Sequence, residues 1–313
     1  MDSALRLLMD SRRHVITAAA ATELGVSPRD LRALVAKGEL FRRCRGAYVD
    51  GAAFRAASSE EQHCFRARGV LALLPSGFAL SHHSTAAAWS LPWLGAIPRR
   101  VHLVREGPGQ HRRSTTHTIH RSLPSVRLQD RDGLRVIEPA YAILGIAAEN
   151  GLRQTVAVLD AGLHTGLVAS SRIEEMLGVC PGWPGHEVVT AATALTDPEA
   201  ESPGESLTRL LLRSLGYSVR SQVEIRATSP EFSARVDFLL EFYPVVIEFD
   251  GLKKYAAADG SADHGALVRA KAREDRLRAL GYEVVRLVWA DLKQPERVRE
   301  LLEAACRRAT KVA

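Results

Sequence analysis

The sequence has little that would make a disulfide scaffold, a cysteine-based zinc module or a membrane protein. Its 313 residues include four cysteines, and no two of them form a CxxC pair. Scattered thiols are typical of a reducing compartment and argue against a zinc site. No run of about 18 apolar residues is present, so we expect no transmembrane span. The first residues lack a basic segment leading into an apolar one, so we expect no secretory signal and a cytoplasmic protein.

Lysine is also scarce, and arginine supplies most of the positive charge. The formal net charge is +6. A basic balance favours an anionic partner, and nucleic acid is the commonest. The length allows two or three domains, each able to bury its own core, so we expect a multidomain protein that mixes α/β and α+β regions.

Residues 1–55 have the pattern of a small unit in which two helices precede a basic hairpin. The alanine-rich segment Val15–Leu24 predicts the first helix. Ser27 is a favourable N-cap for a second helix that runs from Pro28 to about Lys37. Glu39–Val49 predicts the hairpin. Helix, turn, helix and basic hairpin are typical of a winged helix-turn-helix.

The arginines of this unit stand where a winged helix contacts DNA. Arg29 and Arg32 fall early on the second helix, which is the recognition helix of such a fold. Arg42, Arg43 and Arg45 lie near the turn of the hairpin, the wing, from which they can reach phosphates. A helical module that binds protein is the alternative interpretation.

Residues 56–195 predict an α+β middle region. Val101–Arg105 and Thr116–Arg121 alternate like strands, and buried helices are expected after them. Nine arginines stand against three acids between Arg99 and Arg135. That excess fits contact with an anionic surface, although a solvated, charge-rich β face is the simpler account.

Histidines of the middle region suggest a metal site at first sight. Zinc sites combine histidine with cysteine or carboxylate ligands at characteristic spacings. No convincing cysteine or carboxylate accompanies these histidines at ligand spacing, so the sequence does not favour a metal there. The histidines considered are His82, His83, His117 and His120.

A linker and a last domain follow. Thr196–Gly204 combines two prolines, a glycine and acids, which is typical of a linker. Residues 204–313 are therefore expected to form a separate domain. Their apolar patterns predict the element order αβββαβ with a final helix, beginning with a helix that Glu205 opens.

Acids are threaded through an apolar hairpin of this last domain. If a short loop joins its strands, Leu239 lies opposite Val246 and Asp237 lies opposite Glu248. Asp250 points to the same face as Glu248, because side chains alternate along a strand. Like charges at opposed positions destabilise a sheet. A divalent cation such as Mg²⁺ compensates them, since it binds carboxylate oxygens.

The element order and the acids resemble the PD-(D/E)XK restriction-endonuclease fold. More closely, residues 204 to about 305 resemble a family of unknown-function domains related to the very-short-patch-repair endonucleases. The residues that carry the resemblance are Glu205, Arg235, Asp237, Glu248, Asp250, Gly251, Lys254, Tyr255, Arg273, Glu274 and Asp275.

This resemblance implies metal-dependent hydrolysis of phosphodiester bonds. Such hydrolysis needs an activated water and a cation that offsets charge on the phosphoryl oxygens. Asp237 and Glu248 would hold Mg²⁺ or Mn²⁺, and Glu205 would join them. In this fold a lysine two residues after the second acid usually orients the water, but Asp250 stands at that position here. Asp250 would then be a further ligand.

Basic residues downstream would complete the implied nuclease site. As the alternative to Asp250 as a further ligand, Lys253 or Lys254 would fold back to supply the missing positive charge. Lys271, Arg273 and Arg276, on the following helix, would contact the DNA backbone.

The N-terminal half resembles, more weakly, the antitoxins of AbiEi type IV toxin–antitoxin systems. Two hypotheses follow from the two resemblances. One is a bacterial DNA-binding endodeoxyribonuclease acting in defence or repair. The other is an antitoxin-like transcriptional autoregulator with a degenerate nuclease-like domain and a nucleotidyltransferase-like toxin as partner. A surface ion-pair network with Arg235 is the structural alternative for the acids.

Overall fold

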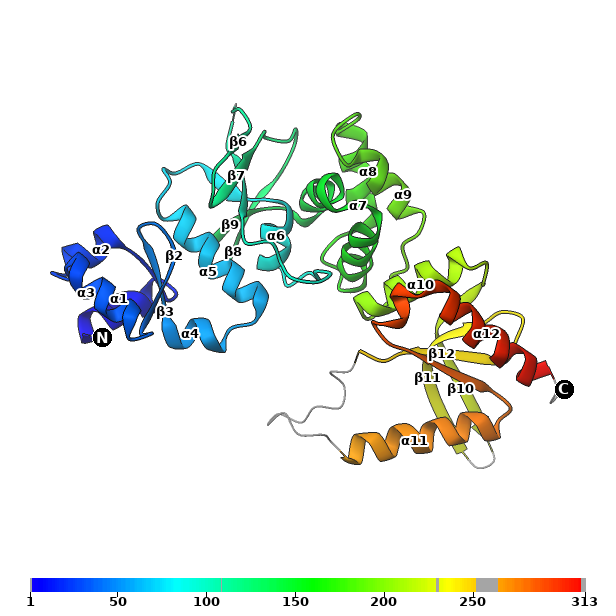
Figure 1. Ribbon diagram of the computed structural model, residues 1–313. Coiled ribbons are helices and arrows are strands. Elements are labelled where there is room, and N and C mark those ends of the chain that lie inside the picture. Colours follow the sequence, from blue (N-terminus) through cyan, green and yellow to red (C-terminus); the bar gives the residue numbers. More distant parts are fainter. Residues whose placement is uncertain (1, 108, 229–230, 252–263, 311–313) are drawn as a thin grey trace. The chain divides into compact units, whose positions relative to one another are not determined.

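The chain has mixed α and β structure, as the sequence predicted. The computed structural model describes residues 2–107, 109–228, 231–251 and 264–310 (Figure 1). Two compact units are present, residues 1–194 and 195–313. The second unit therefore begins at the predicted linker, whereas the predicted boundary between residues 55 and 56 stays a prediction. Within the described ranges, no helix is both long and apolar enough to cross a membrane.

The first fifty residues fold as helices around a small sheet. The elements are α1 (Ser3–Ser11), β1 (Val15–Thr17), α2 (Ala18–Glu23), α3 (Pro28–Ala36), β2 (Leu40–Cys44) and β3 (Ala47–Asp50). The strands form an antiparallel sheet in the order β1-β3-β2. This element order, with a β2–β3 hairpin after two adjacent helices, is typical of a winged helix.

The start of α3 confirms the prediction from Ser27. The Ser27 hydroxyl accepts a hydrogen bond from the Asp30 backbone N–H, and the Asp30 carboxylate accepts one from the Ser27 N–H at 3.0 Å. Together they form a capping box. The prediction of one helix over Val15–Leu24 is wrong, because Val15–Thr17 forms β1. These three residues are β-branched and favour a strand, and the Thr17 side chain then caps α2.

The rest of the first unit wraps helices around a larger sheet. Its elements are α4 (Gly51–Ala56), α5 (Ser59–Leu71), β4 (Phe78–Leu80), α6 (His82–Ala88), β5 (Val101–Arg105), β6 (Arg112–Arg113), β7 (His117–His120), β8 (Leu128–Arg131), β9 (Leu134–Ile137), α7 (Pro139–His164), α8 (Ser170–Val179) and α9 (His186–Thr193). The sheet order is β6-β7-β5-β4-β9-β8.

One apolar core joins the wing to the larger sheet. Cys44 and Ala47 of the wing pack in the same cluster as Ala67 of α5 and Leu80 and Leu103 of the sheet. Helix α5 therefore lies between the two sheets and shares its buried side chains with both. Because burial of apolar surface is the main stabilising term in folding, this shared core explains why residues 1–194 form one compact unit.

The second unit has the element order that the sequence predicted. Its elements are α10 (Pro203–Ser214), β10 (Val219–Thr228), β11 (Glu231–Leu240), β12 (Val245–Phe249), α11 (His264–Ala279), β13 (Glu283–Leu287), the 3₁₀ turn η2 (Asp291–Lys293) and α12 (Pro295–Thr310). The sheet order is β10-β11-β12-β13, and β12 runs parallel to β13. The predicted register is confirmed at Leu239 and Val246, which are partners.

Helices cover both faces of this sheet (Figure 1). Phe238 and Ile247 pack in one cluster with residues of α10 and α12. Leu239 and Val246, which alternate with them along the strands, pack in another cluster with Leu277 of α11. The alternation of side chains therefore makes a three-layer unit, and it turns Asp237 and Glu248 toward the α11 face.

A glycine allows α10 to approach the sheet closely. A Cβ atom at Gly204 would overlap the ring of Phe249. We predict that Gly204→Ala lowers the free energy of unfolding of the second unit by about 1–3 kcal/mol, the usual cost of overpacking a core. Chemical denaturation of the full chain measures this.

Gly251→Ala is the matched control, because its Cβ would lie 3.8 Å from the same ring, an ordinary contact. An equal fall in stability in the two variants would contradict the close approach of α10.

Candidate nucleic-acid interface and acidic pocket

Of the five N-terminal arginines that were predicted to contact DNA, four are exposed. Arg29 and Arg32 lie in the first half of α3, and Arg42 and Arg45 lie on or beside the β2–β3 wing. Exposed guanidinium groups at these two places can reach base edges and phosphates respectively.

Arg43, the fifth, packs against aromatic rings. Its guanidinium carbon lies 3.7 Å from the centre of the Phe54 ring and 4.7 Å from that of Phe41. Burial lowers the pKa of Arg43, and the nearby charge of Arg99 lowers it further. Cation–π contacts of this kind stabilise a fold, so Arg43 fixes the wing in place and is a weaker candidate for a phosphate contact.

In the second unit the predicted acids meet at a small cavity. Asp237, Glu248 and Asp250 line a space of about 80 Å³ together with Arg273 of α11 and Arg286 of β13. The register turns Asp237, Glu248 and Arg286 to the face that α11 covers. The cavity therefore lies between the sheet and α11.

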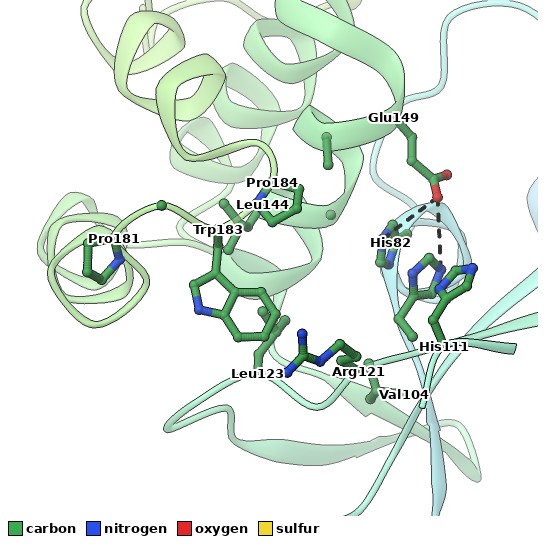
Figure 2. Close-up of a pocket in the computed structure, with 14 residues that line it drawn as sticks. His82, Val104, His111, Arg121, Leu123, Leu144, Glu149, Pro181, Trp183 and Pro184 are labelled. Atoms are coloured by element: carbon green, nitrogen blue, oxygen red, sulfur yellow. Dashed lines mark ion pairs between the residues drawn. The ribbon is translucent and has the colours of Figure 1, made fainter. Parts of the chain in front are cut away.

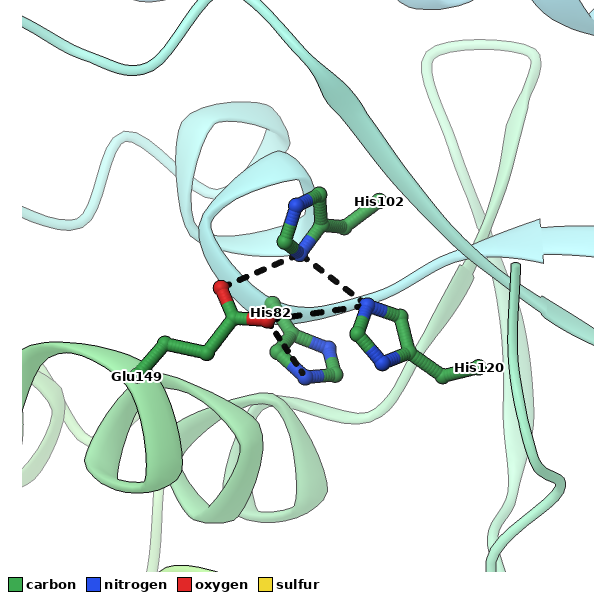
Figure 3. A group of neighbouring side chains, drawn as sticks. All are labelled: His82, His102, His120 and Glu149. Atoms are coloured by element: carbon green, nitrogen blue, oxygen red, sulfur yellow. Dashed lines mark hydrogen bonds and ion pairs between the residues drawn. The ribbon is translucent and has the colours of Figure 1, made fainter. Parts of the chain in front are cut away.

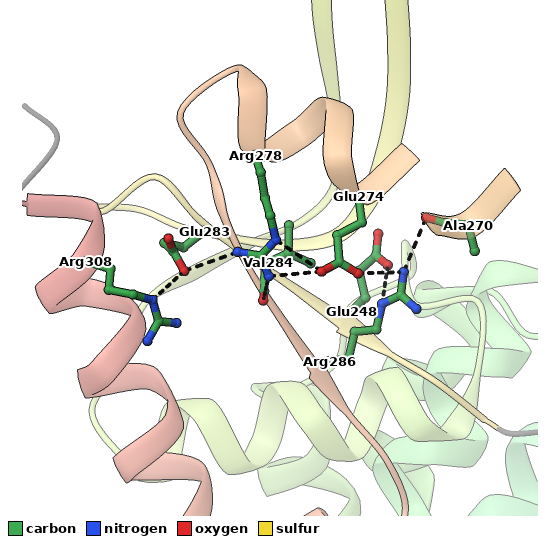
Figure 4. A network of polar contacts seen from close by, with 8 residues as sticks. All are labelled: Glu248, Ala270, Glu274, Arg278, Glu283, Val284, Arg286 and Arg308. Atoms are coloured by element: carbon green, nitrogen blue, oxygen red, sulfur yellow. Dashed lines mark hydrogen bonds and ion pairs between the residues drawn. The ribbon is translucent and has the colours of Figure 1, made fainter. Parts of the chain in front are cut away.

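Guanidinium groups compensate the charge of Glu248. Arg273 Nη2 lies 2.9 Å from Glu248 Oε1, and Arg286 Nε lies 3.8 Å from Glu248 Oε2. Arg286 also pairs with Glu274 at 3.1 Å, and Glu274 pairs with Arg278 at 3.0 Å (Figure 4). The result is a chain of alternating charges between α11 and the sheet.

Asp237 and Arg235 have further partners. Asp237 Oδ2 accepts a hydrogen bond of 2.8 Å from the backbone N–H of Phe249. Arg235 donates to the side chains of Gln222 and Glu201. The ion-pair alternative named Arg235 as the partner of the acids, whereas the cations paired with Glu248 in the structure are Arg273 and Arg286.

Glu205 is buried at the N-terminus of α10. Its Oε1 accepts a hydrogen bond of 2.7 Å from the Ser202 hydroxyl. Its Oε2 accepts one of 2.9 Å from the Glu201 backbone N–H and one of 2.8 Å from Gln222 Nε2. Both carboxylate oxygens thus accept hydrogen bonds from residues at the start of α10, and Oε2 also binds Gln222 of β10. A negative charge is favourable at the N-terminus of a helix.

The acids as placed fit Mg²⁺ poorly. Mg²⁺ requires a nearly ideal octahedron of oxygen atoms. Glu248 faces two guanidinium groups, Asp237 binds a backbone N–H, and Glu205 is engaged by the helix start. A cation would have to compete with these partners for the carboxylates, so binding of Mg²⁺ or Mn²⁺ stays a prediction.

The predicted basic residues are placed in part. Lys253 and Lys254 lie outside the described residues. Lys271 is exposed on α11 and Arg276 is partly buried there. Arg273 donates to the Arg235 backbone carbonyl in addition to its ion pair with Glu248. Their contacts with a DNA backbone stay a prediction.

One group of potential metal ligands was not predicted from the sequence. His82, His102, His120 and Glu149 meet in the first unit. The sequence did not favour a histidine metal site because no convincing cysteine or carboxylate stood at ligand spacing, and His102 was not among the histidines considered. Four elements far apart in the chain supply the group, so no local spacing signals it. The alternating patterns that contain His102 and His120 predicted two strands, and this was the signal in the sequence that two of the ligands lie on one sheet.

Comparison with known proteins finds a similarity in the N-terminal segment. Residues 5–49 match the model of a family described as "Transcriptional regulator, AbiEi antitoxin". This confirms the predicted resemblance for the segment that contains the elements from α1 to β3. The resemblance of residues 204–305 to endonuclease-like domains stays a prediction.

Two relatives are also found. Uncharacterized proteins of Mycobacterium tuberculosis, from strains CDC 1551 / Oshkosh and ATCC 25618 / H37Rv, are each 27% identical to this chain over 195 residues. The matched stretch is 62% of this chain and 69% of each relative.

The pairing of Glu248 predicts a fall in stability on neutralisation. Glu248→Gln keeps the shape but removes the carboxylate that pairs with Arg273 and one of the two carboxylates near Arg286, which keeps its ion pair with Glu274. We expect the unfolding free energy to fall by about 1–2 kcal/mol, because the two guanidinium groups are about a third exposed and water screens them in part. Denaturation in EDTA measures it.

Glu231→Gln, an exposed change on the neighbouring strand β11, is the control and is expected to have an effect within about 0.5 kcal/mol. Full stability of Glu248→Gln would show that the arginines do not compensate this carboxylate.

Proposed function

We propose that this chain is a DNA-binding transcriptional regulator of the antitoxin type, which binds DNA through its N-terminal winged helix. The observation that carries the proposal is the coincidence of two independent results. The segment that matches the regulator family folds in the order α1-β1-α2-α3-β2-β3, and it exposes arginines on both parts that a winged helix uses.

The positions of the exposed arginines support different roles for α3 and for the β2–β3 hairpin, base contact by the helix and phosphate contact by the hairpin. Arg29 and Arg32 follow directly after the capped start of α3, and the N-terminal residues of a recognition helix contact base edges in the major groove. An arginine there can bind guanine O6 and N7 with both arms of its guanidinium. Arg42 and Arg45 on the wing would bind phosphates, which fixes register without reading sequence.

In this proposal the second unit is a nuclease-like scaffold without cleavage activity. The support is the neutralisation of Glu248 by Arg273 and Arg286 and the engagement of Glu205 at the start of α10. A regulator of this type would repress its own promoter, and a nucleotidyltransferase-like toxin would be its partner.

DNA binding is tested with the arginines of α3. We predict that Arg29→Ala/Arg32→Ala weakens binding of the full chain to DNA from upstream of its own gene by about 1–3 kcal/mol for each arginine that binds a base. Arg42→Ala/Arg45→Ala should weaken binding to all sequences and reduce the salt slope by about 1 for each arginine that binds a phosphate. Fluorescence anisotropy at several salt concentrations measures both.

Arg153→Ala, an exposed change on α7, is the control and should leave the affinity unchanged. The proposal fails if wild type shows no preference for any DNA, or if the α3 and control variants bind equally well.

A metal-dependent nuclease is the second candidate function. The observation that favours it is the meeting of Asp237, Glu248 and Asp250 at one cavity of a unit with the element order αβββαβ. Carboxylates at opposed positions on a sheet lower its stability. Hydrolysis of phosphodiesters is a reaction that would use such a pair to hold a metal ion.

A cleavage assay separates the two functions. Double-stranded DNA, single-stranded DNA and RNA are incubated with the full chain and Mg²⁺ or Mn²⁺. If the chain is a nuclease, Asp237→Ala abolishes cleavage and leaves sequence-specific DNA binding intact. Tight binding of wild type to its promoter without cleavage of any substrate would sink the nuclease candidate and favour the regulator.

A further inference from the structure

Four potential metal ligands converge in the first unit. His82 is the first residue of α6, His102 lies on β5, His120 ends β7, and Glu149 lies on α7 (Figure 3). Within the ranges that the structure describes, this is the one group of three or more His, Cys, Asp or Glu side chains whose ligand atoms all lie within 4.8 Å of one another.

The spacing of the ligand atoms suits a tetrahedral metal. His120 Nε2 lies 3.1 Å from His102 Nδ1, and His102 Nδ1 lies 3.4 Å from Glu149 Oε2. Glu149 Oε1 lies 3.9 Å from His120 Nε2 and 4.0 Å from His82 Nε2. Metal–ligand bonds of about 2.0–2.1 Å place the ligands of a tetrahedron roughly 3.3–3.4 Å apart. The separations between these nitrogen atoms and the two oxygen atoms of Glu149 are close to that spacing, so small movements of the side chains would place them around one metal ion.

The backbone around His82 is shaped to hold this ring. His82 has a φ of +50°, a left-handed conformation that is costly for a residue with a side chain. Gly145 of α7 leaves room for the ring, because a Cβ atom there would lie 2.7 Å from its carbon atoms. The other ring nitrogen, Nδ1, lies 3.1 Å from the Ser81 hydroxyl, a contact that orients a ligating histidine.

The electrostatics of the group also suit a cation. His82 and His102 are buried, and burial favours the neutral imidazole, which is the form that binds a metal. Glu149 contributes the carboxylate of the group and is 38% exposed. A divalent cation would bind all four side chains.

A cavity borders the group and offers a route for the metal. It has a volume of about 560 Å³ and is lined in part by His82, His120 and Glu149. Arg121 and Trp183 line it as well (Figure 2). A buried site needs such a route to the solvent if it is to load after folding.

We propose that His82, His102, His120 and Glu149 form a binding site for a divalent transition metal, with Zn²⁺ as the best match. Three imidazoles and one carboxylate are a donor set that Zn²⁺ takes in tetrahedral geometry. The site would join α6 and α7 to strands β5 and β7. This inference is independent of the proposed DNA-binding function and of the acidic pocket.

The test is metal binding by the full chain. Protein stripped with a chelator is titrated with Zn²⁺ in competition with a chromophoric chelator, and with Co²⁺ to record its absorption spectrum. We expect one Zn²⁺ per chain, a tetrahedral Co²⁺ spectrum, and a higher melting temperature of the first unit with metal. In Glu149→Gln and in His120→Gln the affinity should fall at least about 10–100-fold.

His117→Gln is the matched control, because His117 lies on the same strand as His120 but outside the group. It should bind Zn²⁺ as wild type does. If His120→Gln does not fold, Glu149→Gln decides, since the Glu149 side chain is 38% exposed and its replacement should be tolerated. The proposal is overturned if stripped wild type binds no Zn²⁺, or if Glu149→Gln binds it as tightly as wild type.

Discussion

The alternation of side chains across pleated strands is the constraint on which both candidate sites depend. In the second unit it sends Phe238 and Ile247 into one apolar layer, while Asp237 and Glu248 face α11. In the first unit Leu103 packs in the apolar core that includes Cys44 and Ala67, whereas its neighbour His102 belongs to the histidine group. A shift of one residue in register would exchange these faces. The apolar core thus fixes where the polar groups meet.

The two sites resolve the cost of burying polar groups in different ways. In the acidic pocket, Arg273 and Arg286 place guanidinium groups beside Glu248, so the charge is balanced within the protein. In the histidine group, the carboxylate of Glu149 lies within 4.0 Å of three imidazole rings. Buried charge is stable only when it is paired or bound to metal. Because of this difference, we propose the histidine group, and not the pocket, as the metal site.

Local patterns predicted local structure well. The capped helix after Ser27, the basic hairpin, the order of elements after the linker and the pairing of Leu239 with Val246 are all present. Each depends on residues close in sequence or on one hairpin. Where local preferences compete, the prediction was wrong: β-branched residues made Val15–Thr17 a strand within a segment expected to be helical.

The order of residues in the chain was enough to predict the arginines of α3 and of the β2–β3 hairpin and the meeting of Asp237 with Glu248, because capping, turns and strand register act over short distances. The partners of these acids depend instead on three-dimensional packing, since Arg273 and Arg286 come from α11 and β13. The same packing brought His82, His102, His120 and Glu149 together from four separate elements. Helices packed on a sheet set such distances, and no spacing in the chain encodes them.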